Sequence, residues 1–167
     1  MNVATAELPT HRSGAARAIV WGGLLAGVGD ITFAFVVSWL RGVGPERVLQ
    51  SVASGLLGEA AKEGGLATAA LGGLLHFLIA FIWATLFWLL SRRLTFMVRH
   101  PFVCGPLYGF AVYAFMYLVV LPLSAAYFKP TFTPYTVSLN GAGHMLLVGL
   151  PIALAAYKFS DKTWREE

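Results

Sequence analysis

Residues 64–91 read GGLATAALGGLLHFLIAFIWATLFWLLS and contain no Asp, Glu, Lys or Arg. About 20 apolar residues in a helix suffice to cross the hydrocarbon core of a bilayer. An uncharged stretch of this length therefore predicts a transmembrane helix. A helix is expected because it satisfies its own backbone hydrogen bonds in lipid, and because the run lacks the polar–apolar alternation of a barrel strand.

Three further runs resemble this one in composition. Residues 101–128 and 130–157 also lack Asp, Glu, Lys and Arg, and residues 18–40 contain a single charge, Asp30. All twelve Lys and Arg and seven of the eight acids lie outside the four runs. We predict an all-α protein with one transmembrane domain (1–167), whose spans cover about residues 17–40, 65–90, 101–122 and 137–157.

The overall composition agrees with a membrane protein and excludes other classes. Apolar residues make up 57% of the chain and charged residues 12%, and the mean hydropathy is +0.70. Soluble domains carry about 25% charge, and disordered chains are poor in apolar residues. The chain has one cysteine, Cys104, which excludes an intramolecular disulfide and a cysteine metal cluster. Phosphate-loop, nucleophile-elbow and nucleic-acid motifs are also absent, so an enzyme is not favoured and no nucleic-acid partner is expected.

A short segment between the first two spans has a different pattern. Residues 45–62 begin with Pro45 after a glycine-rich break, and their apolar residues recur on one side of a helix. The opposite side carries Arg47, Gln50, Ser54 and Glu59. The segment is too short and too polar to span, so we predict an amphipathic or re-entrant helix on the outer side of the membrane.

The positions of the basic residues predict the orientation. If both termini are cytoplasmic, eight Lys and Arg lie inside and four lie outside. Cytoplasmic segments are enriched in Lys and Arg, so this orientation is favoured. The inner group is Arg12, Arg17, Arg92, Arg93, Arg99, Lys158, Lys162 and Arg165.

Asp30 is the most informative residue because it lies near the middle of the first span. A charge there costs at least about 2.5–3.5 kcal/mol on insertion scales, so such residues usually face the protein interior. Gly22, Ala26 and Ala34 lie at four-residue intervals from it, with Gly23 and Gly27 beside them. Small residues let helices approach closely. We therefore predict helix packing at Gly23 and Gly27, and likewise at Gly105 and Gly109 of the third span.

The other three spans each carry polar side chains at comparable depth. We predict a buried polar site formed by Asp30, His76, Tyr113, Tyr117, Asn140 and His144. Counted from the outer ends, Asp30, His76 and Tyr113 lie at similar depth, with Asn140 and His144 nearer the outside. A proton shared between Asp30 and His76 is one expectation of this arrangement.

Three interpretations of this site stay open. It is a hydrogen-bonded structural network, a proton path or polar-solute site, or a haem or metal site using His76 and His144. No cofactor is predicted, and the depth offset between the two histidines weakens the haem interpretation. Two functions are consistent with these interpretations. One is an accessory or binding subunit, which is a homo-oligomer or part of a larger complex. The other is a proton-coupled transporter or channel for a small solute that acts as an oligomer.

Several blocks of the sequence are similar to a group of small bacterial inner-membrane proteins. These blocks are SVASGLLG (51–58), the run 64–77 ending in His76-Phe77, Gly105-x-x-Tyr108-Gly109, VLPLS (120–124) and VGLPIA (148–153). The resemblance implies four helices and a location in the bacterial plasma membrane. It implies no established activity and no catalytic residues.

Overall fold

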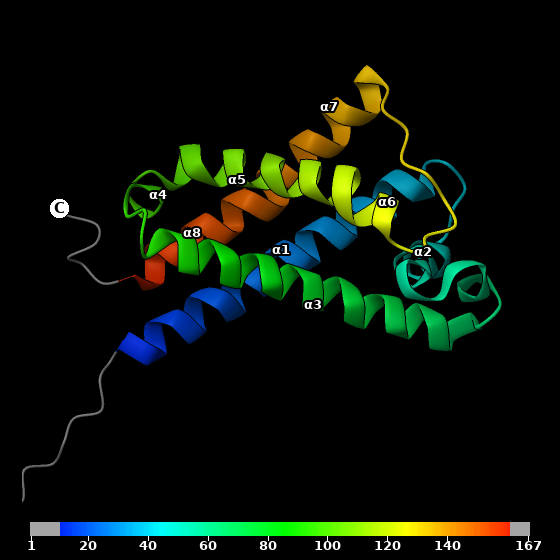
Figure 1. The fold of residues 1–167 in the computed structure, drawn as a ribbon, viewed down its shortest axis with the longest axis horizontal. Coiled ribbons are helices and arrows are strands. Elements are labelled where there is room, and N and C mark those ends of the chain that lie inside the picture. Colours follow the sequence, from blue (N-terminus) through cyan, green and yellow to red (C-terminus); the bar gives the residue numbers. More distant parts are fainter. Residues whose placement is uncertain (1–10, 161–167) are drawn as a thin grey trace, which may run out of the picture.

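Every regular element of the structure, a computed structural model that describes residues 11–160, is a helix (Figure 1). The elements in chain order are α1 (His11–Trp39), α2 (Pro45–Leu57), η1 (Gly58–Lys62), α3 (Gly65–Ser91), α4 (Phe96–Arg99), α5 (Pro101–Phe115), η2 (Met116–Val120), α6 (Leu121–Leu123), α7 (Pro134–Gly143), η3 (His144–Gly149) and α8 (Leu150–Phe159). Two of the basic residues used for orientation, Lys162 and Arg165, lie outside the described residues.

Four helical stretches are long and apolar enough to cross a membrane. They are Gly14–Trp39, Gly65–Ser91, Pro101–Leu123 and Pro134–Phe159. The third is built from α5, η2 and α6, and the fourth from α7, η3 and α8. Large apolar side chains such as Leu74, Leu107 and Leu118 are exposed along these stretches, as hydrocarbon-facing residues are. The prediction of an all-helical chain with four such helices is confirmed.

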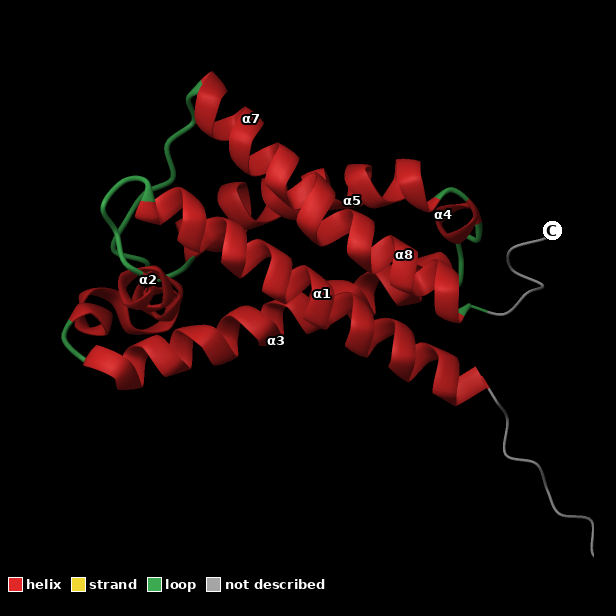
Figure 2. Cartoon of the chain, turned by 180° about the vertical axis from the view of Figure 1, so that it is seen from behind, coloured by secondary structure: helices red, strands yellow, loops and turns green. Residues whose placement is uncertain are grey.

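The four stretches form a bundle in which neighbours are set by direct contact. Helix α1 packs against α3 on one side and α8 on the other, and α5 packs against η3 and α8. Figure 2, seen from behind, shows α1 and the α7–α8 stretch on the near side of the bundle, with α8 beside α1. The fourth stretch therefore lies between the first and the third, so polar groups on α1, α5 and η3 can reach one another.

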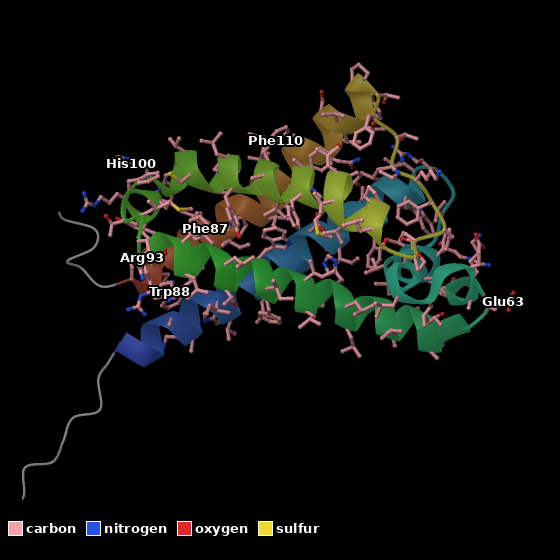
Figure 3. All side chains as sticks on the ribbon, in the orientation of Figure 1. Glu63, Phe87, Trp88, Arg93, His100 and Phe110 are labelled. Atoms are coloured by element: carbon pink, nitrogen blue, oxygen red, sulfur yellow. The ribbon has the colours of Figure 1, made fainter. Side chains whose placement is uncertain are left out.

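The apolar core fills the half of the bundle nearer α4. Its largest fully buried side chains include Phe87, Ile152 and Val98, and alanines occupy most of the remaining positions. Trp88 and Phe87 lie together near that end (Figure 3). Small side chains there allow the helix axes to come close, which dispersion packing in a membrane requires.

Two of the four stretches contain a π-helical turn directly before a proline. The N–H of Leu121 donates to the carbonyl of Met116, and the N–H of Leu150 donates to that of Met145, five residues back in each case. The next residues are Pro122 and Pro151. A proline ring clashes with the carbonyl four residues earlier, and widening the turn relieves that clash.

The opposite end of the bundle is covered by α2, η1 and the loop before α7. The backbone N–H of Ala125 in that loop donates to the carbonyl of Gly55 at 3.0 Å. Helix α2 lies directly on α3, where a Cβ on Gly72 would overlap the carbonyl of Leu49. This close contact holds the connecting segments against the bundle.

The packed side of α2 is not the apolar stripe alone. Val48 and Ala53 of that stripe are buried, but Gln50 and Ser54 of the polar side are also buried, while Leu56 and Leu57 are exposed. Gln50 Nε2 donates to the carbonyl of Gly65 at 3.1 Å, where α3 begins. The polar side thus contacts the backbone at the start of α3, because the amide can satisfy a carbonyl that a leucine could not.

Candidate functional site

The candidate site lies where α1, α5 and the fourth stretch meet. Asp30 of α1 points at His144, the first residue of η3, with Oδ1 3.8 Å from Nδ1. Their side chains are 22% and 15% exposed, respectively. The separation is too long for a hydrogen bond, so the two side chains are neighbours without being bonded to each other.

His144 Nδ1 donates its proton to a hydrogen bond within its own helical stretch. This nitrogen lies 3.0 Å from the backbone carbonyl of Asn140. Because a carbonyl oxygen can only accept, Nδ1 must donate. The contribution of Asn140 to the site is therefore its backbone oxygen. The carboxylate of Asp30, which is 22% exposed, is left with no hydrogen bond to any residue of 11–160.

Two tyrosines of the third stretch, Tyr113 of α5 and Tyr117 of η2, lie beside His144. The ring centroids of Tyr113 and His144 are 5.4 Å apart, and those of Tyr117 and His144 are 6.4 Å apart. The two tyrosine rings are 4.5 Å apart, one turn along the helix. Tyr117 is the second residue of η2 and is half-buried.

Tyr113 is the most deeply buried polar side chain of the site. It is 3% exposed, and its hydroxyl has no hydrogen-bond partner among the residues described. Buried hydroxyls are nearly always paired, and leaving one unpaired costs about 1–3 kcal/mol. Tyr113 and Asp30 both flank the His144 side chain, so a buried unpaired hydroxyl and a partly exposed carboxylate lie beside one ring.

His76 has a partner other than Asp30. Its Nε2 lies 2.9 Å from the carbonyl oxygen of Gly27, three residues before Asp30 on α1. The histidine that faces the carboxylate is His144, which differs from the expected Asp30–His76 proton sharing. The expected depth of His76 is counted from the predicted end of its span, and such a count is accurate only to about one helical turn. In the structure, the His76 side chain meets α1 at Gly27. His76 therefore joins two helices through a backbone oxygen.

The four glycines expected at helix contacts lie at close approaches. The rings of Phe81 and Phe77 on α3 cover Gly23 and Gly27, so any side chain there would collide with them. A Cβ on Gly105 would lie 2.9 Å from the Cα of Leu150, and one on Gly109 would overlap the carbonyl of His144. Gly109 thus sets how near α5 comes to η3, and with it the distance between Tyr113 and His144.

The π turns were not expected, although their cause is visible in the sequence. Pro151 predicts a kink and a freed carbonyl at Leu147. A Cβ built on Gly29 would lie 3.2 Å from that oxygen, so the freed carbonyl packs against α1 beside Asp30. π turns in helices frequently occur at functional sites. Here one contains Tyr117 and the other begins at His144.

No group of three or more His, Cys, Asp or Glu side chains that could hold a metal ion occurs among residues 11–160. Comparison with known proteins adds no further information on the site: no protein-family model matches the chain, and neither curated proteins nor solved structures give a significant match.

Proposed function

We propose that this chain is a non-enzymatic, multi-pass protein of the bacterial inner membrane whose buried Asp30–His144–Tyr113 site binds a small polar ligand. In this proposal it acts as a binding or accessory subunit, alone as a homo-oligomer or within a larger membrane complex. The observation that carries the proposal is the buried Tyr113 hydroxyl without a partner, which shares the neighbour His144 with a carboxylate that also has no hydrogen bond within residues 11–160.

Physical chemistry supports a ligand over a purely structural role. A structural network is useful when each buried polar group is paired, because an unpaired group weakens the fold. In this site the carboxylate accepts nothing and the hydroxyl donates to nothing within residues 11–160. A small molecule with a hydrogen-bond donor and an acceptor would satisfy both groups.

The test is native mass spectrometry of the protein purified in mild detergent. We expect the wild type to retain a bound small molecule, and Tyr113→Phe to lose it. Tyr108→Phe is the matched control, because Tyr108 lies on the same helix but donates to the carbonyl of Trp83 at 2.7 Å. Absence of a bound small molecule from all three proteins, or equal retention of it by all three, would contradict the proposal.

A second candidate function is a proton-coupled transporter or channel that acts as an oligomer. The π turns favour it, since η2 and η3 interrupt two neighbouring helices at the level of Tyr117 and His144. Four helices enclose little volume, so an oligomer would be needed. Proteoliposomes with a pH gradient distinguish the functions: a transporter shows flux that Asp30→Asn abolishes and Lys129→Gln retains, whereas a binding protein shows none above empty vesicles.

We infer that both termini are cytoplasmic and that α2 and η1 lie at the outer surface, either in the interface or partly re-entrant. The excess of Lys and Arg on the side of the termini supports this orientation. The exposed Leu56 and Leu57 on α2 would then contact lipid at the outer interface.

A further inference from the structure

The end of the bundle that carries α4 has an unusual charge distribution. Its described cations are Arg17, Arg92, Arg93, Arg99 and Lys158, and the acids among residues 14–160 lie elsewhere: Asp30 farther along α1, and Glu46, Glu59 and Glu63 at the opposite end. Among residues 14–160, this end therefore carries five Lys and Arg and no acid, whereas the other end carries four Lys and Arg and three acids.

Helix α4 is fixed in place by its inner side. Val98 is fully buried and Met97 is 9% exposed, and Met97 belongs to the core cluster beside Phe87 and Ile152. The segment between α3 and α5 is therefore packed against the bundle. Its position fixes where the flanking cations are presented.

The outer side of the same segment is both apolar and basic. Leu94, Phe96 and Phe102 are 44%, 52% and 72% exposed, and they alternate with the exposed Arg93 and His100. Arg93 has no ion-pair partner among residues 11–160. Figure 3 shows Arg93 and His100 at the same end of the molecule, opposite Glu63.

The location of the segment sets what it contacts. The uncharged part of α3 ends at Ser91 and that of α5 begins at Pro101, so in a membrane that these helices cross α4 would lie at the boundary between hydrocarbon and water. The polar headgroup layer on each side of a bilayer is several ångströms thick and contains the lipid phosphates. Exposed phenylalanines suit the upper acyl region, and arginines beside them reach the phosphates.

We propose that the α4 surface, defined as Arg93, Leu94, Phe96, His100 and Phe102, binds the headgroups of anionic phospholipids. Arg93 contacts the phosphate, and the apolar side chains insert beside the acyl chains. This inference rests on the four helices crossing a membrane and is independent of any ligand at Asp30.

The test is a titration of phosphatidylglycerol into the purified protein in neutral detergent, followed by thermal unfolding and native mass spectrometry. We expect phosphatidylglycerol to bind in preference to phosphatidylcholine with the same acyl chains. Arg93→Gln should weaken the apparent affinity about fivefold, because one cation near an anionic surface contributes roughly 1 kcal/mol. Arg93→Lys should retain most of the affinity.

Lys129→Gln is the matched control, since Lys129 is an exposed cation at the other end of the bundle. It should leave the affinity within twofold of wild type. Three results would overturn the proposal: equal binding of the two lipids, equal losses in Arg93→Gln and Lys129→Gln, or full displacement of the lipid by inorganic phosphate at matched ionic strength. The last would indicate a site for free phosphate.

Discussion

Oδ1 of Asp30 lies 3.8 Å from Nδ1 of His144, across the contact between α1 and a π-helical turn. The imidazole proton on Nδ1 is directed to the Asn140 carbonyl at 3.0 Å and not to the carboxylate. The carboxylate is consequently held near a partner without being hydrogen-bonded to it. Such an arrangement leaves the Asp30 oxygens available to a proton or a ligand.

The pairing of Asp30 with His144 predicts a specific energetic coupling. A double-mutant cycle with Asp30→Asn and His144→Gln should give an interaction free energy of about 0.5–3 kcal/mol, the range found for contacting residues. Asp30→Asn and His76→Gln should be additive within about 0.5 kcal/mol, because His76 bonds to the Gly27 backbone. The measurement is the free energy of unfolding in mixed micelles. Larger coupling to His76 than to His144 would reverse the assignment.

The unpaired hydroxyl of Tyr113 predicts that its removal does not weaken the fold. Tyr113→Phe should be neutral or stabilising by up to about 1 kcal/mol in the protein without ligand, since no hydrogen bond is lost. Tyr108→Phe should destabilise by about 1 kcal/mol, because it removes the 2.7 Å bond to the Trp83 carbonyl. Thermal unfolding of both variants measures the difference. A clear destabilisation by Tyr113→Phe would show that the hydroxyl is satisfied in the folded protein.

Close backbone contact at Gly109 predicts sensitivity to a single methyl group. Gly109→Ala should destabilise by about 1–3 kcal/mol, because the new Cβ overlaps the backbone of His144 and must push α5 away. Gly73→Ala is the control: the nearest atom to its Cβ is Leu49 Cδ2 at 3.9 Å, so the added methyl group fits, and alanine favours the helix. Unfolding midpoints in detergent test the pair. Equal midpoints would show that α5 and η3 separate without cost.

The sequence predicts the number and class of the helices well, because charge is almost absent from the spans. Twelve Lys and Arg lie outside four apolar runs, and lipid permits little other than helices in those runs. The close approaches at Gly105 and Gly109 are also suggested by residue size alone. These features depend on composition and on regular helical spacing.

The partner of Asp30 could not be predicted in the same way. A π turn adds one residue to a helical turn, so it rotates every later residue by about 100° relative to a regular helix. After the π turns at η2 and η3, side chains therefore point in other directions than regular helical spacing predicts. Pro122 and Pro151 mark where this happens, but not how the helix adjusts. The burial of Gln50 likewise depends on a backbone carbonyl at Gly65, which no side-chain pattern reveals.

The inferred orientation predicts opposite labelling of the two ends of the bundle. Glu63 and Arg93 are both exposed and lie at opposite ends (Figure 3). In a Cys104→Ala background, Glu63→Cys should react with a membrane-impermeant maleimide in intact cells, because the positive-inside rule places α2 and η1 outside. Arg93→Cys should react only after the cytoplasmic face is opened.

The choice of positions matters because not every residue of the α2 segment is accessible. Ser54 is fully buried, so a probe there would stay unlabelled in either orientation. Glu63 avoids this ambiguity, and Glu59, whose side chain is 71% exposed, provides a second outer position. Because replacing Arg93 removes one inner cation, the exposed His100 is replaced in His100→Cys as an inner position with an unchanged number of Lys and Arg. If Glu63→Cys and Glu59→Cys react only in opened membranes while the inner positions react in intact cells, the termini are outside and the charge bias does not set the orientation.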